Sequence, residues 1–144
     1  MLKNISPLIS PELLKILAEM GHGDTVVLAD ANYPACSGGA KHVVRADGIG
    51  VPTLLEAILP LLPLDTFVAK PITLMEVVPG DNYVPDIWNE YRRIFNNNDL
   101  NDDQLETIER FAFYEHADTA YCVVATGERA RYANVILKKG IIEA

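Results

Sequence analysis

The chain has 144 residues, of which 49% are hydrophobic, and its 12 Lys and Arg and 20 Asp and Glu give a formal net charge of -8. This length and apolar content predict one globular domain, residues 1–144, whose core needs no metal or disulfide to fold. An acidic chain without clusters of Lys and Arg is a poor partner for nucleic acid or for an anionic membrane surface. A neutral small molecule is the partner class that the composition favours.

The two cysteines, Cys36 and Cys122, form neither a CxxC pair nor a zinc-ligand pattern. The first residues show no signal-peptide pattern, and the longest apolar run, 58–64, is interrupted by prolines and is too short to span a bilayer. We therefore expect two reduced thiols in a cytoplasmic protein.

Helix and strand signals alternate along the first half of the chain. Ser10 can cap a helix that opens with Pro11 and ends at Gly21, because its side-chain oxygen can accept a hydrogen bond from a free backbone N–H. The continuously apolar run 25–29, rich in β-branched residues, predicts a short strand that is buried on both faces. The other elements expected in this half are a loop at 30–41, a strand at 43–45 and a helix from Pro52 to about Pro60.

The alternation continues in the second half of the chain. The expected elements are a strand at 72–78, a helix at 86–95, a helical stretch from 102 that breaks near 110, a helix at 113–119, a strand at 121–125, a polar loop at 126–132 and a strand at 134–138. Alternating helices and strands predict an α/β fold, here a three-layer α/β/α domain with a mainly parallel, mixed sheet.

Two residues that flank the run 25–29 are candidates for chemistry. His22 lies between two glycines, so its approach is open, and it is either a general acid or base or an exposed loop histidine. Asp30 follows the run directly, and the carboxyl end of a buried strand is where open α/β sheets place ligand-binding groups. A turn-forming aspartate is the alternative for Asp30.

Further polar residues are expected at the same edge of the sheet. Arg110 precedes the helix that leads into the strand 121–125, so it can reach this edge unless it forms a surface salt bridge with Glu106 or Glu109. No phosphate-loop, dinucleotide-binding, HExxH or nucleophile-elbow motif occurs, so we expect no cofactor and no metal. The loop after the strand 121–125 is followed by two residues whose polar side chains suit sugar hydroxyls, namely Tyr132 and Asn134.

Several of these segments together resemble a known family. They are 18–24 with its Gly-His-Gly turn, Ala-Asp-Ala at 29–31, Arg-Phe-Ala-Phe-Tyr-Glu at 110–115, Thr-Gly-Glu-Arg-Ala at 126–130 and Tyr-Ala-Asn at 132–134. With them the chain resembles the RbsD/FucU family of sugar mutarotases over nearly its whole length, apart from 83–103. Arg110 points to the fucose branch, because the ribose branch typically has a histidine at this position.

The resemblance implies that the protein interconverts the α and β anomers of a free reducing sugar, L-fucose, by acid–base ring opening and reclosure without a cofactor. It also implies a homo-oligomer, a ring-shaped decamer as in bacterial members. Two alternatives stay open: a mutarotase or pyranase for another monosaccharide such as D-ribose, and a non-catalytic oligomeric sugar-binding protein. By resemblance, His22 is the proton donor, and the sugar-binding residues are Asp30, Arg110, Tyr132, Ala133 and Asn134.

The chain departs from many relatives at Asn32 and Cys36, where histidines often stand.

The separation of His22 from Asp30 along the chain predicts where the two residues lie relative to the sheet. Eight residues that include a strand span up to ~26 Å at about 3.3 Å per residue, so these two residues are expected at opposite edges of the sheet. Either the glycine-flanked turn folds His22 back, or His22 serves the pocket of a neighbouring subunit. We expect the second arrangement, in which each site is shared between subunits.

Overall fold

A computed structural model of the protein describes all 144 residues, and six strands form a single sheet. β6 runs antiparallel to both of its neighbours, β1 and β3, whereas the other three pairings are parallel. The sheet is therefore mixed and mainly parallel, as the sequence predicts. In the sheet order β2-β5-β1-β6-β3-β4, the strands are β1 (Thr25–Ala29), β2 (His42–Ala46), β3 (Ile72–Met75), β4 (Leu105–Ile108), β5 (Cys122–Thr126) and β6 (Val135–Lys138).

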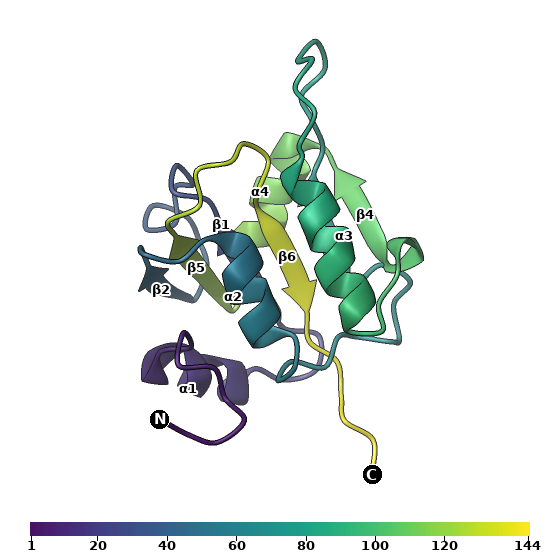
Figure 1. Ribbon diagram of the computed structural model, residues 1–144. Coiled ribbons are helices and arrows are strands. Elements are labelled where there is room, and N and C mark those ends of the chain that lie inside the picture. The colour runs from purple at the N-terminus through teal and green to yellow at the C-terminus, as the bar shows by residue number, and fades with distance from the viewer.

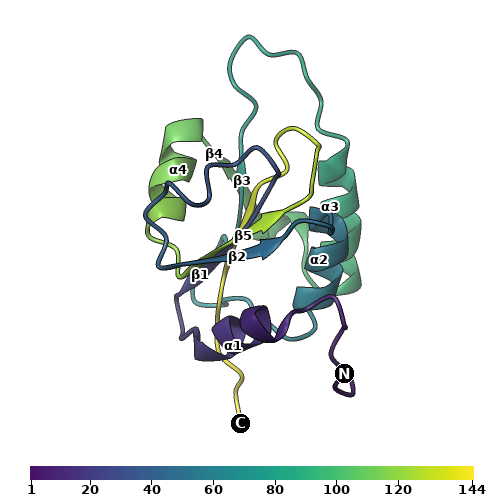
Figure 2. The same cartoon turned by 90° about the vertical axis from the view of Figure 1, so that its left-hand side faces the viewer.

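Four helices cover this sheet: α1 (Pro11–Glu19), α2 (Val51–Ile58), α3 (Ile87–Asn97) and α4 (Arg110–Asp118). α2 and α3 lie on one face, α4 lies on the other, and α1 closes the end of the sheet near the N-terminus (Figures 1 and 2). The predicted three-layer α/β/α fold is confirmed. The loop 77–86, between β3 and α3, projects from the opposite end (Figure 1). No helix combines the length and the apolar character needed to cross a membrane.

The two faces of the sheet are covered unequally. The buried cluster beneath α1, α2 and α3 has 25 residues, whereas the cluster beneath α4 has 10, with Phe113 as its only phenylalanine. On the thinner side, the loop 30–41 supplements α4 through Ala35 and the partly buried Tyr33. On this thinner side, α4 and the loop 30–41 supply four of the residues that line the candidate site described below, Arg110, Tyr114, Asn32 and Tyr33.

The turn after α1 fixes the position of His22. Ser10 caps the helix as predicted, since its hydroxyl accepts a hydrogen bond from the backbone N–H of Leu13 at 3.1 Å. Beyond the helix, Gly23 has a φ of 88°, which favours glycine, and its N–H donates to the carbonyl of Lys139 at 2.8 Å. This turn holds His22 at the end of the sheet where β1 begins and β6 finishes.

The helical stretch predicted from 102 is wrong. One turn of 3-10 helix, Asp102–Gln104, is followed by the edge strand β4, which pairs in parallel with β3. Four mostly half-buried residues at a sheet edge give no apolar alternation, so the pairing with β3 determines this strand and the local pattern does not. As a result, α4 begins at Arg110 instead of 113, directly after the carboxyl end of β4.

Candidate active site

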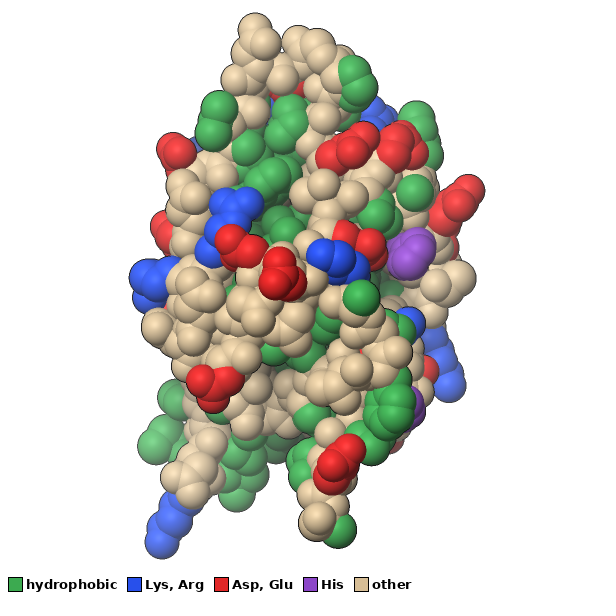
Figure 3. Space-filling view, turned by 90° about the vertical axis from the view of Figure 1, so that its right-hand side faces the viewer, with side chains coloured by type: hydrophobic (Ala, Val, Ile, Leu, Met, Phe, Trp, Pro, Cys, Tyr) green, Lys and Arg blue, Asp and Glu red, His purple; other side chains and the backbone are tan.

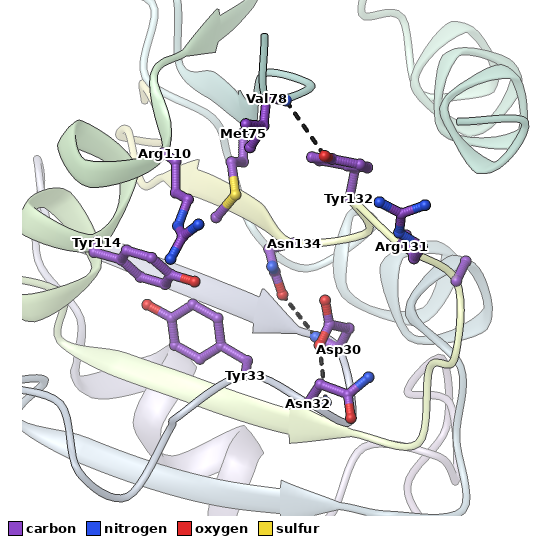
Figure 4. Close-up of a pocket in the computed structure, with 11 residues that line it drawn as sticks. Asp30, Asn32, Tyr33, Met75, Val78, Arg110, Tyr114, Arg131, Tyr132 and Asn134 are labelled. Atoms are coloured by element: carbon purple, nitrogen blue, oxygen red, sulfur yellow. Dashed lines mark hydrogen bonds between the residues drawn. The ribbon is translucent and has the colours of Figure 1, made fainter. Parts of the chain in front are cut away.

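A cavity of about 260 Å³ lies at the edge of the sheet where β1 ends and β6 begins (Figure 4). Its volume lies just below the range of roughly 300–1,000 Å³ typical of small-molecule sites, which suits a small ligand. It is lined by polar, aromatic and aliphatic side chains, so it offers hydrogen bonds and apolar contact together. The lining residues are Asp30, Asn32, Tyr33, Met75, Val78, Arg110, Tyr114, Ala130, Arg131, Tyr132 and Asn134.

A hydrogen bond joins Asp30, directly after β1, to Asn134, directly before the neighbouring strand β6. The backbone N–H of Asp30 donates to the side-chain oxygen of Asn134 at 2.7 Å, and the Asp30 carboxylate accepts from the N–H of Asn32 at 2.9 Å. Asp30 therefore forms the turn that was one of its two sequence-based interpretations, and it also lines the cavity, whereas its binding of a ligand stays a prediction. Burial raises the pKa of Asp30 above its ordinary value. Hydrogen bonds from the backbone of Asn32, the side chain of Asn134 and the backbone of Tyr33 lower this pKa, but the effect of burial is larger.

Tyr132 is fixed by the projecting loop 77–86. Its hydroxyl donates to Asp81 at 2.7 Å and accepts from the N–H of Val78 at 3.3 Å, while its carbonyl accepts from the indole N–H of Trp88 at 2.8 Å. The hydroxyl of Tyr132 is the main cause that lowers the pKa of Asp81, followed by the backbone of Tyr83. The loop thus sets where the Tyr132 ring lies in the cavity.

Ala133 differs from the other predicted sugar-binding residues. It is fully buried, its carbonyl accepts the hydroxyl of Tyr91 at 2.6 Å, and it does not line the cavity. The hydrogen bond to Tyr91 anchors the backbone between its two neighbours, Tyr132 and Asn134, which both face the cavity (Figure 4).

Arg110 forms no salt bridge, so the predicted alternative to a pocket role does not occur. Glu109 instead caps α4, because its carboxylate accepts from the N–H groups of Phe111 and Ala112. The Arg110 guanidinium lies 5.1 Å from the ring centroid of Phe111 and 5.9 Å from that of Tyr114. Its N–H donors therefore remain available to a ligand in the cavity.

An aromatic wall completes the cavity and was not foreseen from the sequence. The rings of Tyr33 and Tyr114 lie with their centroids 5.7 Å apart, opposite Met75 (Figure 4). Burial is the main cause that raises the pKa of Tyr33, so its hydroxyl stays protonated at neutral pH. The one available signal for Tyr114 was its spacing of four residues from Arg110, which places both on the same face of a helix.

His22 lies away from this cavity, at the other end of β1. Its Nε2 atom is 3.0 Å from a carboxylate oxygen of Asp65, and its ring centroid is 5.2 Å from that of Phe67. The His22 side chain is 44% exposed and does not line the cavity. The structure therefore brings Asp30, Arg110, Tyr132 and Asn134 together and leaves His22 apart.

No group of three or more His, Cys, Asp and Glu side chains is placed to hold a metal ion. Asn32 lines the cavity, whereas Cys36 is exposed and lies outside its lining. The fold and the cavity together define a three-layer α/β protein with a small polar and aromatic pocket at one edge of a mixed sheet.

Comparison with known proteins identifies the family. Residues 3–142 match the RbsD / FucU transport protein family, and the chain belongs to it. It is 53% identical over 141 residues to an L-fucose mutarotase of Actinobacillus pleuropneumoniae, covering 98% of this chain and 97% of that protein.

Two solved structures are similar over almost their whole length. One is the fucose mutarotase of Streptococcus pneumoniae in complex with L-fucose, with a TM-score of 0.94 and 48% identity, covering 99% of this chain and 100% of that one. The other is FucU from Bifidobacterium longum, with a TM-score of 0.94 and 53% identity, covering 98% of this chain and 100% of that one.

Proposed function

We propose that this protein is an L-fucose mutarotase, an isomerase that interconverts the α and β anomers of the free sugar. The observation that carries the proposal is the convergence of Asp30, Arg110, Tyr132 and Asn134 in one small cavity of a chain about half identical to L-fucose mutarotases. A neutral sugar suits this cavity, because its hydroxyl groups can both donate to and accept from these side chains.

The reaction needs proton transfers at two sugar oxygens. A proton leaves the anomeric hydroxyl and one reaches the ring oxygen as the bond between this oxygen and C1 breaks. Rotation about C1–C2 then allows the ring to close on the other face. General acid–base help of this kind contributes about 10²–10⁴-fold. We assign it to His22, and we assign the hydroxyl contacts to the cavity residues.

The cavity residues have distinct roles in this proposal. The carboxylate of Asp30 accepts from sugar hydroxyls, the Arg110 guanidinium donates to sugar oxygens, and the amide of Asn134 has its –NH₂ group left to donate. Ala133 contributes through its backbone, because its anchored carbonyl keeps Tyr132 and Asn134 in register.

A shared site reconciles these roles with the position of His22. We propose a homo-oligomer, a ring-shaped decamer, in which His22 of one subunit reaches the cavity of the next. Both partners of this contact carry an exposed phenylalanine, Phe67 beside His22 and Phe111 beside Arg110, and such side chains are suited to burial between subunits. The two unpaired thiols, Cys36 and Cys122, favour the cytoplasm as the compartment.

The test is exchange NMR of the protein with L-fucose, D-ribose and D-galactose. Faster exchange between the anomers of L-fucose than of the other two sugars is the expected result. If the anomers of D-ribose or D-galactose exchange faster than those of L-fucose, the protein is a mutarotase for that sugar instead, and the proposed reaction class still holds. Binding of L-fucose without faster exchange would instead identify a non-catalytic sugar-binding protein and contradict the proposal.

A further inference from the structure

Lys139 is the residue directly after β6, and its half-buried side chain lies against the end of α1. The last carbonyl groups of a helix have no partner within it, and α1 has no basic residue in its last turn. Lys139 supplies the missing donor from the other end of the chain. Its Nζ atom donates to the carbonyl of Leu17 at 2.8 Å and to that of Met20 at 2.5 Å, and a positive charge at this end of a helix is favourable.

The backbone of Lys139 binds the same turn on its other side. Its carbonyl accepts from the N–H of Gly23 at 2.8 Å, and its N–H donates to the carbonyl of Asp24 at 2.8 Å. His22 lies between these two pairs of contacts and has no backbone hydrogen bond of its own. Lys139 therefore brackets His22, because its side chain holds the residues before the histidine and its backbone holds the residues after it.

Lys139 is itself held firmly in place. It pairs with Leu64 in an antiparallel bridge, and the N–H of the next residue, Gly140, donates to the carbonyl of Pro63 at 2.7 Å. A Cβ atom at Gly140 would lie only 2.6 Å from the carbonyl oxygen of Leu64, so the two backbones are in direct contact. The glycines on either side of His22 give the turn little conformational preference of its own, and the contacts with Lys139 must define its path.

We propose that Lys139 is a positioning residue for anomer exchange, which holds both flanks of the turn 21–23 and so places the imidazole of His22 for proton transfer with the sugar. Lys139 does not line the cavity and takes no part in proton transfer itself. Its effect is large because a displacement of about 1 Å at a reacting group can cost about 10²-fold in rate. This inference rests on the proposed role of His22.

The first test uses the wild-type protein in its native assembly. NMR measures how fast the protons of each lysine ammonium group exchange with water, and the Lys139→Arg variant assigns the signal of Lys139. We expect slower exchange at Lys139, which donates to two carbonyl groups, than at Lys15, whose side chain is 73% exposed on α1. Equally fast exchange at the two lysines would overturn the proposal.

The second test compares the kinetics of two variants of Lys139. Lys139→Met keeps an unbranched side chain but removes the charge and the donors, so kcat for L-fucose exchange should fall by about 10–100-fold. KM should change little, because the sugar contacts are assigned to the cavity. Lys139→Arg keeps the charge and the donors and should recover part of kcat. Lys15→Met is the control and should behave as wild type.

Three kinetic results would contradict the positioning role. They are an unchanged kcat in Lys139→Met, a rise in KM alone, and a kcat in Lys139→Arg that is no higher than in Lys139→Met. Failure of the proposed function looks different, because His22→Ala would then exchange the anomers at the wild-type rate.

Mixed assemblies distinguish this role from general damage to the fold. In a shared site, Lys139 acts on the histidine of its own subunit, so Lys139→Met still supplies an intact cavity. Subunit exchange with Asp30→Ala should therefore restore about a quarter of the sites, whereas exchange with His22→Ala should restore none. Recovery with His22→Ala would overturn the proposal. So would no recovery with Asp30→Ala under conditions in which His22→Ala and Asp30→Ala complement each other.

Discussion

At the scale of single residues, His22 differs from the other two histidines in what its imidazole contacts. His42 packs against Tyr121 with ring centroids 4.9 Å apart, and His116 is exposed in the last turn of α4. Only His22 combines an open approach with a carboxylate at one ring nitrogen. Such a combination suits a general acid or base, because one nitrogen is fixed and the other is free.

The first prediction is that His22→Ala lowers the rate of L-fucose anomer exchange by about 10²–10⁴-fold, the usual contribution of a general acid or base. The fold and sugar binding should persist, since the cavity residues are untouched. Exchange NMR measures the rate, and a sugar titration measures binding. His116→Ala serves as the control and should behave as wild type. Wild-type exchange in His22→Ala would contradict the assignment.

The second prediction concerns Arg110, whose guanidinium offers a fixed fork of donors where histidine offers one or two. Arg110→His should weaken the binding of L-fucose relative to D-ribose by about 3–10-fold, the equivalent of one net hydrogen bond. Competitive titration of the two sugars gives the ratio. Arg93→His, at an exposed position on α3, should leave the ratio unchanged. An equal loss of affinity for both sugars would show that Arg110 does not determine specificity.

Some site residues could be predicted from the order of elements, and others could not. Asp30 was expected at this edge because it follows a predicted strand, and Arg110 because it precedes the helix that leads into the strand 121–125. Asp65 lies in a stretch without a predicted element, and its contact with His22 spans 43 residues. Tyr33 likewise lies in a loop. Such residues reach their positions through tertiary packing alone, so no local sequence pattern predicts them.

At the scale of elements, the direction of β6 determines the composition of the cavity. Asp30 follows β1, whereas Asn134 precedes β6, and the two meet because β6 runs antiparallel to β1. The sequence predicted the strand near 134–138 but not its direction. It also missed β4, because a short edge strand has no apolar alternation to reveal it. Element order was thus predictable, whereas strand direction and edge pairing required the structure.

The third prediction concerns the loop 77–86, which orients Tyr132 through Asp81. Asp81→Asn should raise KM for L-fucose about 2–10-fold with kcat little changed, because a neutral amide accepts the hydrogen bond from Tyr132 more weakly than a carboxylate and loses the ion pair with Arg131, which loosens a binding group. Steady-state exchange rates over a range of sugar concentrations separate the two constants. Asp86→Asn is the control, since Asp86 lies on the same loop and makes no capping hydrogen bond. A fall in kcat alone would instead implicate Tyr132 in proton transfer.

At the scale of the whole molecule, the net charge opposes association between copies of the chain, whereas the exposed apolar surface favours it. Copies that each carry a net charge of -8 repel at long range, so an assembly of this chain needs apolar contacts. Large apolar side chains are exposed near both candidate halves of the site: Phe67 by 67%, Phe111 by 64% and Val84 by 74%. Figure 3 shows apolar side chains in the hollow beneath the projecting loop, with charges of both signs around it. Mixed charges at the rim of an apolar patch are typical of surfaces that associate.

The last prediction is that two inactive variants complement each other. His22→Ala supplies an intact cavity, and Asp30→Ala supplies an intact histidine at the other end of β1. If each site combines the cavity of one subunit with the histidine of its neighbour, random exchange of equal amounts restores about a quarter of the sites. Exchange NMR measures the recovered activity, and native mass spectrometry verifies that subunits have mixed.

A second mixture distinguishes shared sites from a general effect of mixing. Asp30→Ala and Arg110→Ala both damage the same cavity, so no combination of these chains contains an intact one, and their mixture should stay inactive. Recovery in the first mixture and none in the second is the expected pair of results. Verified subunit exchange without recovery in the first mixture, or a structure with His22 and Asp30 of one chain around the same sugar, would contradict a shared site. In either case His22 would have to reach its own cavity, which lies beyond the full length of β1, by a rearrangement of the turn at Gly23.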